Sequence, residues 1–259
     1  NLINGLSDER RKKYLTEILK SLEFQLNIPE KQELPYDIFS EKTFGYKIQR
    51  VTNSEIEEVQ NNIKELEVEI GLSRQEVFLK YAVDDQEKIP DLFGQFIKLT
   101  KEKLPLEILD FPDKGFDIEI VSDKPWSAFN WHVSPFKSKL SINKDVGLSK
   151  ADLEDLAFHE GYGGHHSELS NKDKMLLEGR GEHGLVIVYS PQVFISEAIA
   201  MGCSYVFGEI EMDKEKLLMW TYNQLSFCLQ NLATYLHFDD KKGIDEIKDV
   251  LSKYYISEK

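Results

Sequence analysis

The feature that most constrains this chain is an eight-residue segment, residues 159–166, which reads His-Glu-Gly-Tyr-Gly-Gly-His-His and holds three of the six histidines. Apolar residues at Leu153, Leu156 and Ala157 have helical spacing and predict a helix that runs into the first of these histidines. The three glycines allow that helix to break, because glycine readily adopts turns and bulges. The segment therefore predicts the end or a bulge of one helix directly after Glu160.

The residue types in this segment are those of a zinc hydrolase. A histidine ring nitrogen is a common zinc ligand. The residue that follows His159 points about 100° away around the helix. There the Glu160 carboxylate can act as the general base that takes a proton from the attacking water.

The spacing differs from the usual His-Glu-x-x-His pattern, since position 163 is glycine. The next histidines, His165 and His166, follow His159 by six and seven residues. On a straight helix, seven residues span roughly 10 Å, too far for one ion with bonds of about 2 Å. A break after Glu160 would bring one of the two to the metal, and we expect His165 to be the ligand. His166 would then be a supporting group or an oxyanion donor.

A third ligand is expected from another helix. Glu197 is the only charged residue between Pro191 and Gly208, and carboxylates in apolar helices are rarely buried unless they are paired or bind a metal. Glu168 is the competing candidate. His159, His165 and Glu197 would form a His₂Glu site with an open position, as catalytic zinc requires.

The remaining periodicity predicts a mainly α fold with a small antiparallel β-sheet, of the α+β class. Helices are expected over residues 6–26, 54–70, 75–83 and 90–103, and strands over 116–121, 126–133 and 139–143. Later helices are expected from Ser149, which has Asp152 three residues on as in a capping box, and from Ser190-Pro191, followed by residues 213–237 and 244–255. We assign residues 1–110 to a helical region and 111–259 to the sheet and the metal-site helices, as one catalytic unit.

Composition excludes several classes of partner. The net charge is −14 without a dense basic stripe, which disfavours nucleic acids and anionic membranes. No apolar run approaches the 18 or so residues of a membrane span, so a soluble protein is expected. Cys203 and Cys228 are interpreted as buried thiols, compatible with the cytoplasm, although a chain that starts at Asn1 leaves room for a removed targeting segment.

Two segments resemble a known family. His-Glu-Gly-Tyr-Gly-Gly-His-His is similar to the His-Glu-Ala-Tyr-Pro-Gly-His-His motif of the bacterial domain-of-unknown-function 885 family, predicted zinc metallopeptidases related to the gluzincins. Glu197 and Ala200 match the Glu and Ala of its second motif, Glu-Gly-Trp-Ala, whereas Ile199 replaces the tryptophan. The resemblance implies a gluzincin-like architecture and a metallopeptidase-like activity.

The resemblance also implies a substrate site beside the metal. In gluzincin-like enzymes an edge strand pairs with the substrate backbone, so Asn130, His132 and Asn143 are candidate substrate-binding residues. Tyr205 is a candidate hydrogen-bond donor to the transition-state oxyanion. The expected function is peptide or amide hydrolysis with zinc. A metal-dependent amidase acting on small molecules and a non-catalytic domain that binds a metal or a partner are the alternatives.

Overall fold

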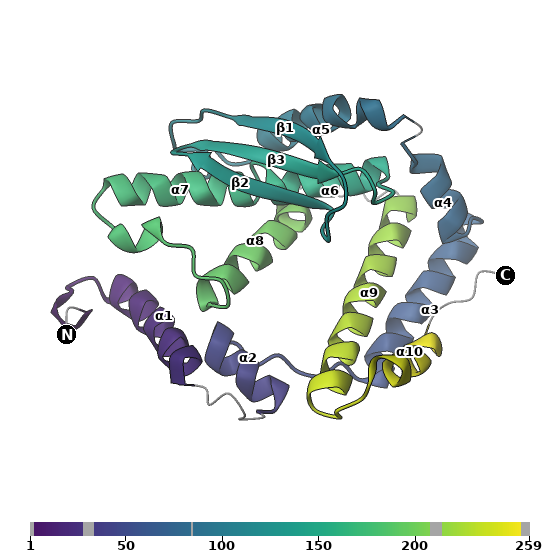
Figure 1. The fold of residues 1–259 in the computed structure, drawn as a ribbon. Coiled ribbons are helices and arrows are strands. Elements are labelled where there is room, and N and C mark those ends of the chain that lie inside the picture. The colour runs from purple at the N-terminus through teal and green to yellow at the C-terminus, as the bar shows by residue number, and fades with distance from the viewer. Residues whose placement is uncertain (1–2, 28–33, 84, 208–213, 255–259) are drawn as a thin grey trace. The chain divides into compact units, whose positions relative to one another are not determined.

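The computed structural model describes residues 3–27, 34–83, 85–207 and 214–254, without the side chains of Asn4 and Tyr205. The chain divides into two compact units. Unit 1 comprises residues 1–77, 189–191 and 212–259, and unit 2 comprises residues 78–188 and 192–211. Each unit is described by itself, with the elements labelled as in Figure 1.

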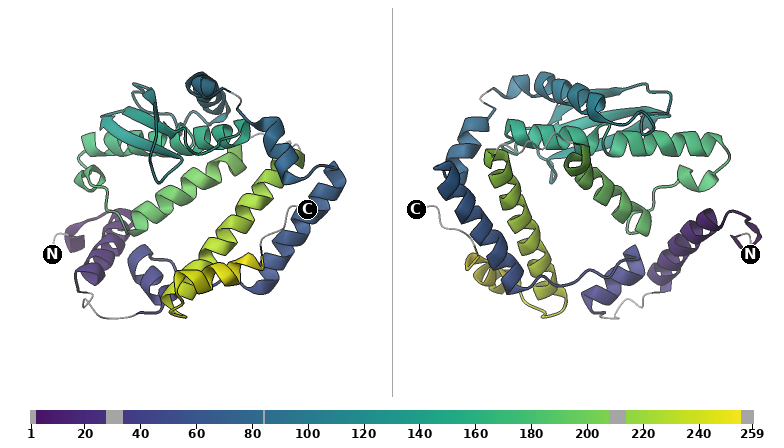
Figure 2. Two further views of the ribbon diagram at one scale, coloured as in Figure 1. Left: turned by 45° about the vertical axis from the view of Figure 1, so that its right-hand side comes forward. Right: turned by 180° about the vertical axis from the view of Figure 1, so that it is seen from behind.

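Unit 1 is helical in its described part. Its elements are η1 (Ile3–Gly5), α1 (Glu9–Asn27), α2 (Tyr36–Phe44), α3 (Asn53–Ile70), α9 (Lys214–Phe238) and α10 (Ile244–Ser252). Helices α3 and α9 pack along each other, and Figure 2 shows them side by side from two further directions. Ile56 and Ile63, seven residues apart on one face of α3, are fully buried.

Unit 2 carries the sheet and the segment 159–166. It contains η2 (Gln86–Lys88), α5 (Ile89–Lys103), β1 (Phe116–Val121), β2 (Ala128–Ser134), β3 (Lys137–Asn143), α6 (Lys150–Glu160), α7 (His165–Leu177), η3 (Gly181–Gly184) and α8 (Pro191–Phe207) without its first residue. Helix α4 (Arg74–Tyr81) contributes residues to both units. Figure 1 shows α6 and α7 nearly end to end along one face of the sheet.

The three predicted strands form, but the sheet is mixed and not wholly antiparallel. The strand order is β1-β3-β2, with β1 parallel to β3 and β2 antiparallel to β3. A two-residue turn, Pro135 and Phe136, joins β2 to β3 and makes that pair an antiparallel hairpin. Because β1 lies on the far side of β3, the central strand β3 is the most buried of the three, and β2 lies at an edge.

The core of unit 2 lies between α5, β3 and α6. Phe93 and Ile97 of α5, Leu140 and Ile142 of β3, and Leu153 of α6 are all at most 2% exposed. Burial of this kind is the main stabilising contribution in a domain, about 25 cal/mol per Å² of apolar surface. The core therefore fixes α6, whose last residues are His159 and Glu160.

Helix α6 begins as the sequence predicts. The Ser149 hydroxyl accepts a hydrogen bond from the Asp152 amide at 3.2 Å, and the Asp152 carboxylate accepts one from the Ser149 amide at 2.8 Å. The predicted capping box is confirmed, and it satisfies two amides that a helix start would leave unpaired. Within the described part of the chain, no helix has the length and apolarity needed to cross a bilayer.

Candidate metal centre

The segment 159–166 joins two helices through a tight turn. Helix α6 ends at Glu160 and α7 begins at His165, so the predicted break after Glu160 is confirmed. The carbonyl oxygen of Gly161 accepts hydrogen bonds from the amides of Gly164, at 3.3 Å, and His166, at 3.1 Å. This turn brings His159 and His165 close together although they are six positions apart in the sequence, and their ring centroids are 4.8 Å apart.

Glycine is required in this turn because there is no room for a side chain. A Cβ at Gly161 would lie 2.4 Å from the carbonyl oxygen of Ala157. A Cβ at Gly164 would lie 2.0 Å from the carbonyl oxygen of His159 and 2.9 Å from Cβ of Ala200. From the sequence, we expected the glycines to supply conformational freedom for the break. The structure shows that close packing of the backbone is the stronger requirement for glycine at these positions.

The three residues predicted as ligands, His159, His165 and Glu197, lie together. Glu197, on α8, places one carboxylate oxygen 3.4 Å from Nε2 of His159 and the other 3.4 Å from Nε2 of His165. One ligand atom from each of the three residues lies within 4.8 Å of the others. The structure thus brings His165, and not His166, to His159 and Glu197.

The electrostatics of the cluster reflect its mixed charges. Burial lowers the pKa of His165, but the carboxylates of Glu168 and Glu197 outweigh it and raise that pKa to about 10. Hydrogen bonds from His159 and His165 hold the pKa of Glu197 well below its usual range. The Glu197 side chain is 51% exposed, so its ion pairs are partly screened by solvent.

Helix α8 approaches the turn through small side chains. Ala200 is 1% exposed and faces Gly164, and Cys203 is close enough to Gly163 that a Cβ there would lie 2.6 Å from its Sγ. Burial raises the pKa of the Cys203 thiol to about 11, which makes it an inert packing group. This close approach sets Glu197, one turn before Ala200, beside the two imidazoles.

Glu160 is buried beside this cluster. It is 5% exposed, and its Oε2 has no hydrogen-bond partner among the described residues. Burial raises the pKa of Glu160, partly offset by the nearby His159 and His165. Leaving a buried carboxylate oxygen unpaired costs folding free energy. A group that can accept a proton from water or substrate is expected to have this feature.

His166 points away from the cluster, contrary to the expectation that it acts at the reaction centre. Its ring is fully buried, with Nδ1 2.9 Å from the Ser138 hydroxyl and Nε2 3.2 Å from the Asp113 carboxylate. It packs edge-on against Phe116 and Tyr162. Consecutive helical residues point about 100° apart, so His165 and His166 cannot face the same ion.

Asp113 is the shared partner in a second group of side chains, formed with Lys101, Tyr162 and His166, and no sequence pattern indicated it. Its carboxylate accepts hydrogen bonds from the Tyr162 hydroxyl and the Lys101 ammonium group, both at 2.6 Å. Although burial acts in the opposite sense, these donors hold the pKa of Asp113 well below its usual range. Burial and Asp113 together raise the pKa of Tyr162 to about 12. Through Tyr162 and His166, this group holds the turn by contacts separate from those of His159, His165 and Glu197.

The other predicted site residues are placed differently. The Asn130 amide donates to the Glu160 carbonyl at 2.6 Å, and its Oδ1 is buried without a partner in the described residues. Nε2 of His132 lies 2.8 Å from the Asp173 carboxylate. Asn143 does not reach the site: its amide donates to the carbonyls of Lys124 and Trp126 and so holds a loop. The side chain of Tyr205 lies outside the described residues.

A pocket of about 480 Å³ contains the cluster. Its walls combine the edge strand β2, the end of α6, the first half of α7, the start of α8 and the segment before α8. It is lined by Ala128, Phe129, Asn130, Trp131, His132, His159, Glu160, His165, Glu168, Leu169, Lys172, Val186, Val188, Val193, Ser196 and Glu197. The two predicted substrate residues Asn130 and His132 line this pocket, and Asn143 does not.

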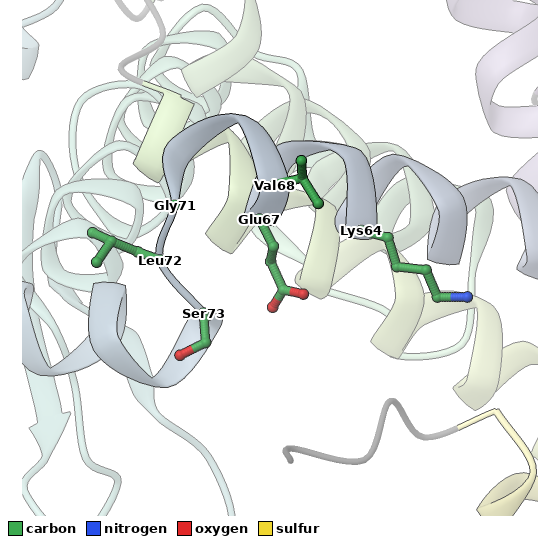
Figure 3. A pocket seen from close by; sticks show the side chains of 6 residues that line it. All are labelled: Lys64, Glu67, Val68, Gly71, Leu72 and Ser73. Carbon is green, nitrogen blue, oxygen red and sulfur yellow. The ribbon is translucent and has the colours of Figure 1, made fainter.

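A smaller hollow in unit 1 has no comparable chemistry. It measures about 340 Å³ and lies at the end of α3, where Gly71 follows the last helical residue. Figure 3 shows Lys64 and Glu67 as its charged side chains. Its described lining contains no imidazole or thiol, so it offers no metal site of the kind found in unit 2.

Comparison with known proteins identifies a similar fold but no related protein of known function. No model of a known protein family and no curated protein matches the sequence. The chain is similar to a solved structure titled "The crystal structure of the putative lipoprotein from Colwellia psychrerythraea", with a TM-score of 0.59 and 15% identity. The similarity covers 85% of this chain and 42% of that chain, so this chain spans less than half of its neighbour's length. At this identity the likeness concerns the fold alone.

Proposed function

We propose that this protein is a zinc-dependent hydrolase of the metallopeptidase type with a gluzincin-like architecture. One observation carries the proposal: two imidazoles and a carboxylate converge within 4.8 Å beside a buried glutamate whose Oε2 has no partner among the described residues. The ligands would be His159, His165 and Glu197, and the general base would be Glu160. Metal-site geometry and a neighbouring base together are what define this class of hydrolase.

The donor set fits zinc. Bonds of about 2.0–2.1 Å in a tetrahedron place neighbouring ligand atoms about 3.3 Å apart. Two of the ligand pairs, from Glu197 to His159 and to His165, are already separated by 3.4 Å. Two imidazoles and one carboxylate also leave a fourth position open, as in catalytic zinc sites.

The chemistry divides between the ion and the protein. Zinc held by His159, His165 and Glu197 would supply a Lewis acid that activates water and polarises a carbonyl oxygen. Glu160 accepts the proton of the attacking water and passes it to the leaving nitrogen. The raised pKa of Glu160, caused by burial, brings this carboxylate closer to the range in which it can both take and return a proton. Asn130 fixes the end of α6 by donating to the Glu160 carbonyl.

The pocket suits an extended peptide or a small amide. Strand β2 lies at an edge of the sheet and lines the pocket, so its backbone is placed to pair with an extended substrate. Leu169, Val186 and Val188 supply apolar wall next to the ligands. Substrates with apolar side chains beside the cleaved bond are therefore expected to be preferred.

The test combines metal content with turnover. Purified protein should contain one zinc per chain by elemental analysis, and His159→Ala should lose it. Glu160→Gln should keep the zinc and lose hydrolysis of a peptide library by at least about 100-fold, the usual contribution of a general base. Glu107→Gln, an exposed glutamate elsewhere in unit 2, is the matched control and should match the wild type.

Three results would count against the proposal. They are a protein without zinc after metal reconstitution, a Glu160→Gln variant with full activity, and a zinc-loaded protein that cleaves neither peptides nor small amides. Cleavage of small amides alone would assign the site to an amidase.

We also propose a reducing, cytoplasmic location, supported by the two free cysteines, Cys203 and Cys228, and tested by cell fractionation.

A further inference from the structure

Glu168 lies directly behind one of the proposed ligands. It is one helical turn after His165 on α7, and its Oε2 is 3.6 Å from Nδ1 of that ring. Nε2 of the same ring faces Glu197 at 3.4 Å. The two nitrogens lie on different edges of an imidazole, so Glu168 and Glu197 contact the ring from different sides.

The carboxylate of Glu168 is itself held in place from two directions. One oxygen contacts the ammonium group of Lys172, four residues on along α7. The other oxygen accepts a hydrogen bond from the Ser196 hydroxyl on α8. The side chains of Glu168 and Lys172 are only 18% and 14% exposed, so this pair is largely shielded from solvent.

Ser196 is the residue immediately before Glu197. A single carboxylate thus contacts the ring of one proposed ligand and the neighbour of another, on two different helices. In metal sites a carboxylate behind a histidine ligand fixes the ring's orientation and tautomer. With the proton on Nδ1 facing Glu168, Nε2 keeps a free lone pair directed toward Glu197 and His159.

We propose that Glu168 is a positioning residue of the metal centre, which orients His165 for binding through Nε2 and ties α8, with Glu197, to α7. It is not a ligand, because it contacts Nδ1 of the ring and not Nε2, the nitrogen that would bind the ion. Lys172 holds the Glu168 carboxylate in place through their ion pair along α7. This inference rests on the proposed function, since it assumes that His159, His165 and Glu197 bind zinc.

The experiment measures zinc affinity by competition with a chromophoric chelator. Glu168→Gln keeps the size of the side chain and removes its charge. Zinc affinity should fall by about 10–100-fold, the usual effect of losing such a partner. Glu178→Gln, an exposed glutamate at the end of the same helix, is the matched control and should not change it.

Glu168→Gln alone leaves Lys172 buried without its partner, which could destabilise the metal-free protein. The double variant Glu168→Gln/Lys172→Met removes both charges together. It should recover the unfolding midpoint of the metal-free wild type and still show the 10–100-fold loss in zinc affinity. A residue with only a structural role would recover both properties together.

Two outcomes would overturn the inference while the metal site stands. The first is wild-type zinc affinity in both Glu168 variants. The second is complete loss of zinc, equal to that of His165→Ala, or, in a Glu168→Gln protein that still binds cobalt, a changed visible spectrum of the cobalt-substituted protein; either result would make Glu168 a ligand. Absence of zinc binding in the wild type would instead refute the proposed function itself.

Discussion

The turn between α6 and α7 allows a prediction in which a single added methyl group abolishes the proposed metal site. In Gly164→Ala the new Cβ would lie 2.0 Å from the carbonyl oxygen of His159, whereas Cβ contacts below 3.0 Å essentially do not occur. The backbone must therefore open by about 1 Å. Because that oxygen belongs to the last turn of α6 and not to a flexible side chain, the opening moves His159 relative to His165.

The expected magnitude follows from this displacement. Overpacking of a buried site usually costs about 1–3 kcal/mol, and a forced backbone shift places Gly164→Ala at about 3 kcal/mol of lost unfolding free energy. Metal–ligand distances in well-formed sites stay within about 0.2 Å of their usual values. A shift several times larger should abolish stoichiometric zinc binding even in protein that remains folded.

The assays are urea unfolding of the metal-free protein and zinc titration. Gly202→Ala is the matched control, because a Cβ at that position on α8 meets nothing within 4 Å. Alanine in a helix is favoured over glycine by up to about 1 kcal/mol, so this variant should be slightly stabilised and should bind zinc normally. Wild-type stability and zinc affinity in Gly164→Ala would refute the close packing on which the site's geometry depends.

Two further predictions distinguish the roles of His159, His165 and Glu197 from those of the residues around them. His166→Ala should lower the unfolding free energy by about 2–4 kcal/mol, because it empties a fully buried site and leaves Ser138 and Asp113 without that partner. The variant should still bind one zinc per chain. Loss of zinc by elemental analysis would contradict the placement of His166 away from the cluster. The second concerns pH: His165 has a pKa raised to about 10 in the metal-free protein, so its stabilising contribution is complete below its ordinary value of 6.5 and is lost as the pH rises toward 10. Urea unfolding of chelator-treated protein from pH 6 to 10 should show this decline, with a weaker decline in Glu197→Gln, and an identical decline in both proteins would show that Glu197 is not the cause.

Much of the secondary structure could be predicted from local patterns. The helix over 54–70 corresponds to α3, which ends at Ile70 before Gly71, and the predicted strand over 116–121 corresponds to β1. The Ser149 cap and the break after Glu160 are equally local, because side chain, backbone and glycine act within a few residues. The mainly α fold with a small sheet follows from these patterns.

The pairing of the strands could not be predicted in the same way. Alternating apolar residues indicate a strand and its buried face, but they do not specify which strand is its neighbour. The β2–β3 hairpin is set by its short turn. The parallel pairing of β1 with β3 depends on how α5 and α6 cover the sheet, which is a property of the packed unit.

The sequence by itself determined which residue types could form a metal site and that the helix carrying His159 must break, since both depend on residues within one short segment. Only the tertiary structure placed His165, and not His166, beside His159, brought Glu197 to this pair from α8, and placed Glu168 at the Nδ1 edge of the His165 ring. It also moved Asn143 out of the site and introduced Asp113 as the partner of His166. These choices depend on contacts between segments tens of residues apart, and such contacts are fixed by packing and not by local propensity.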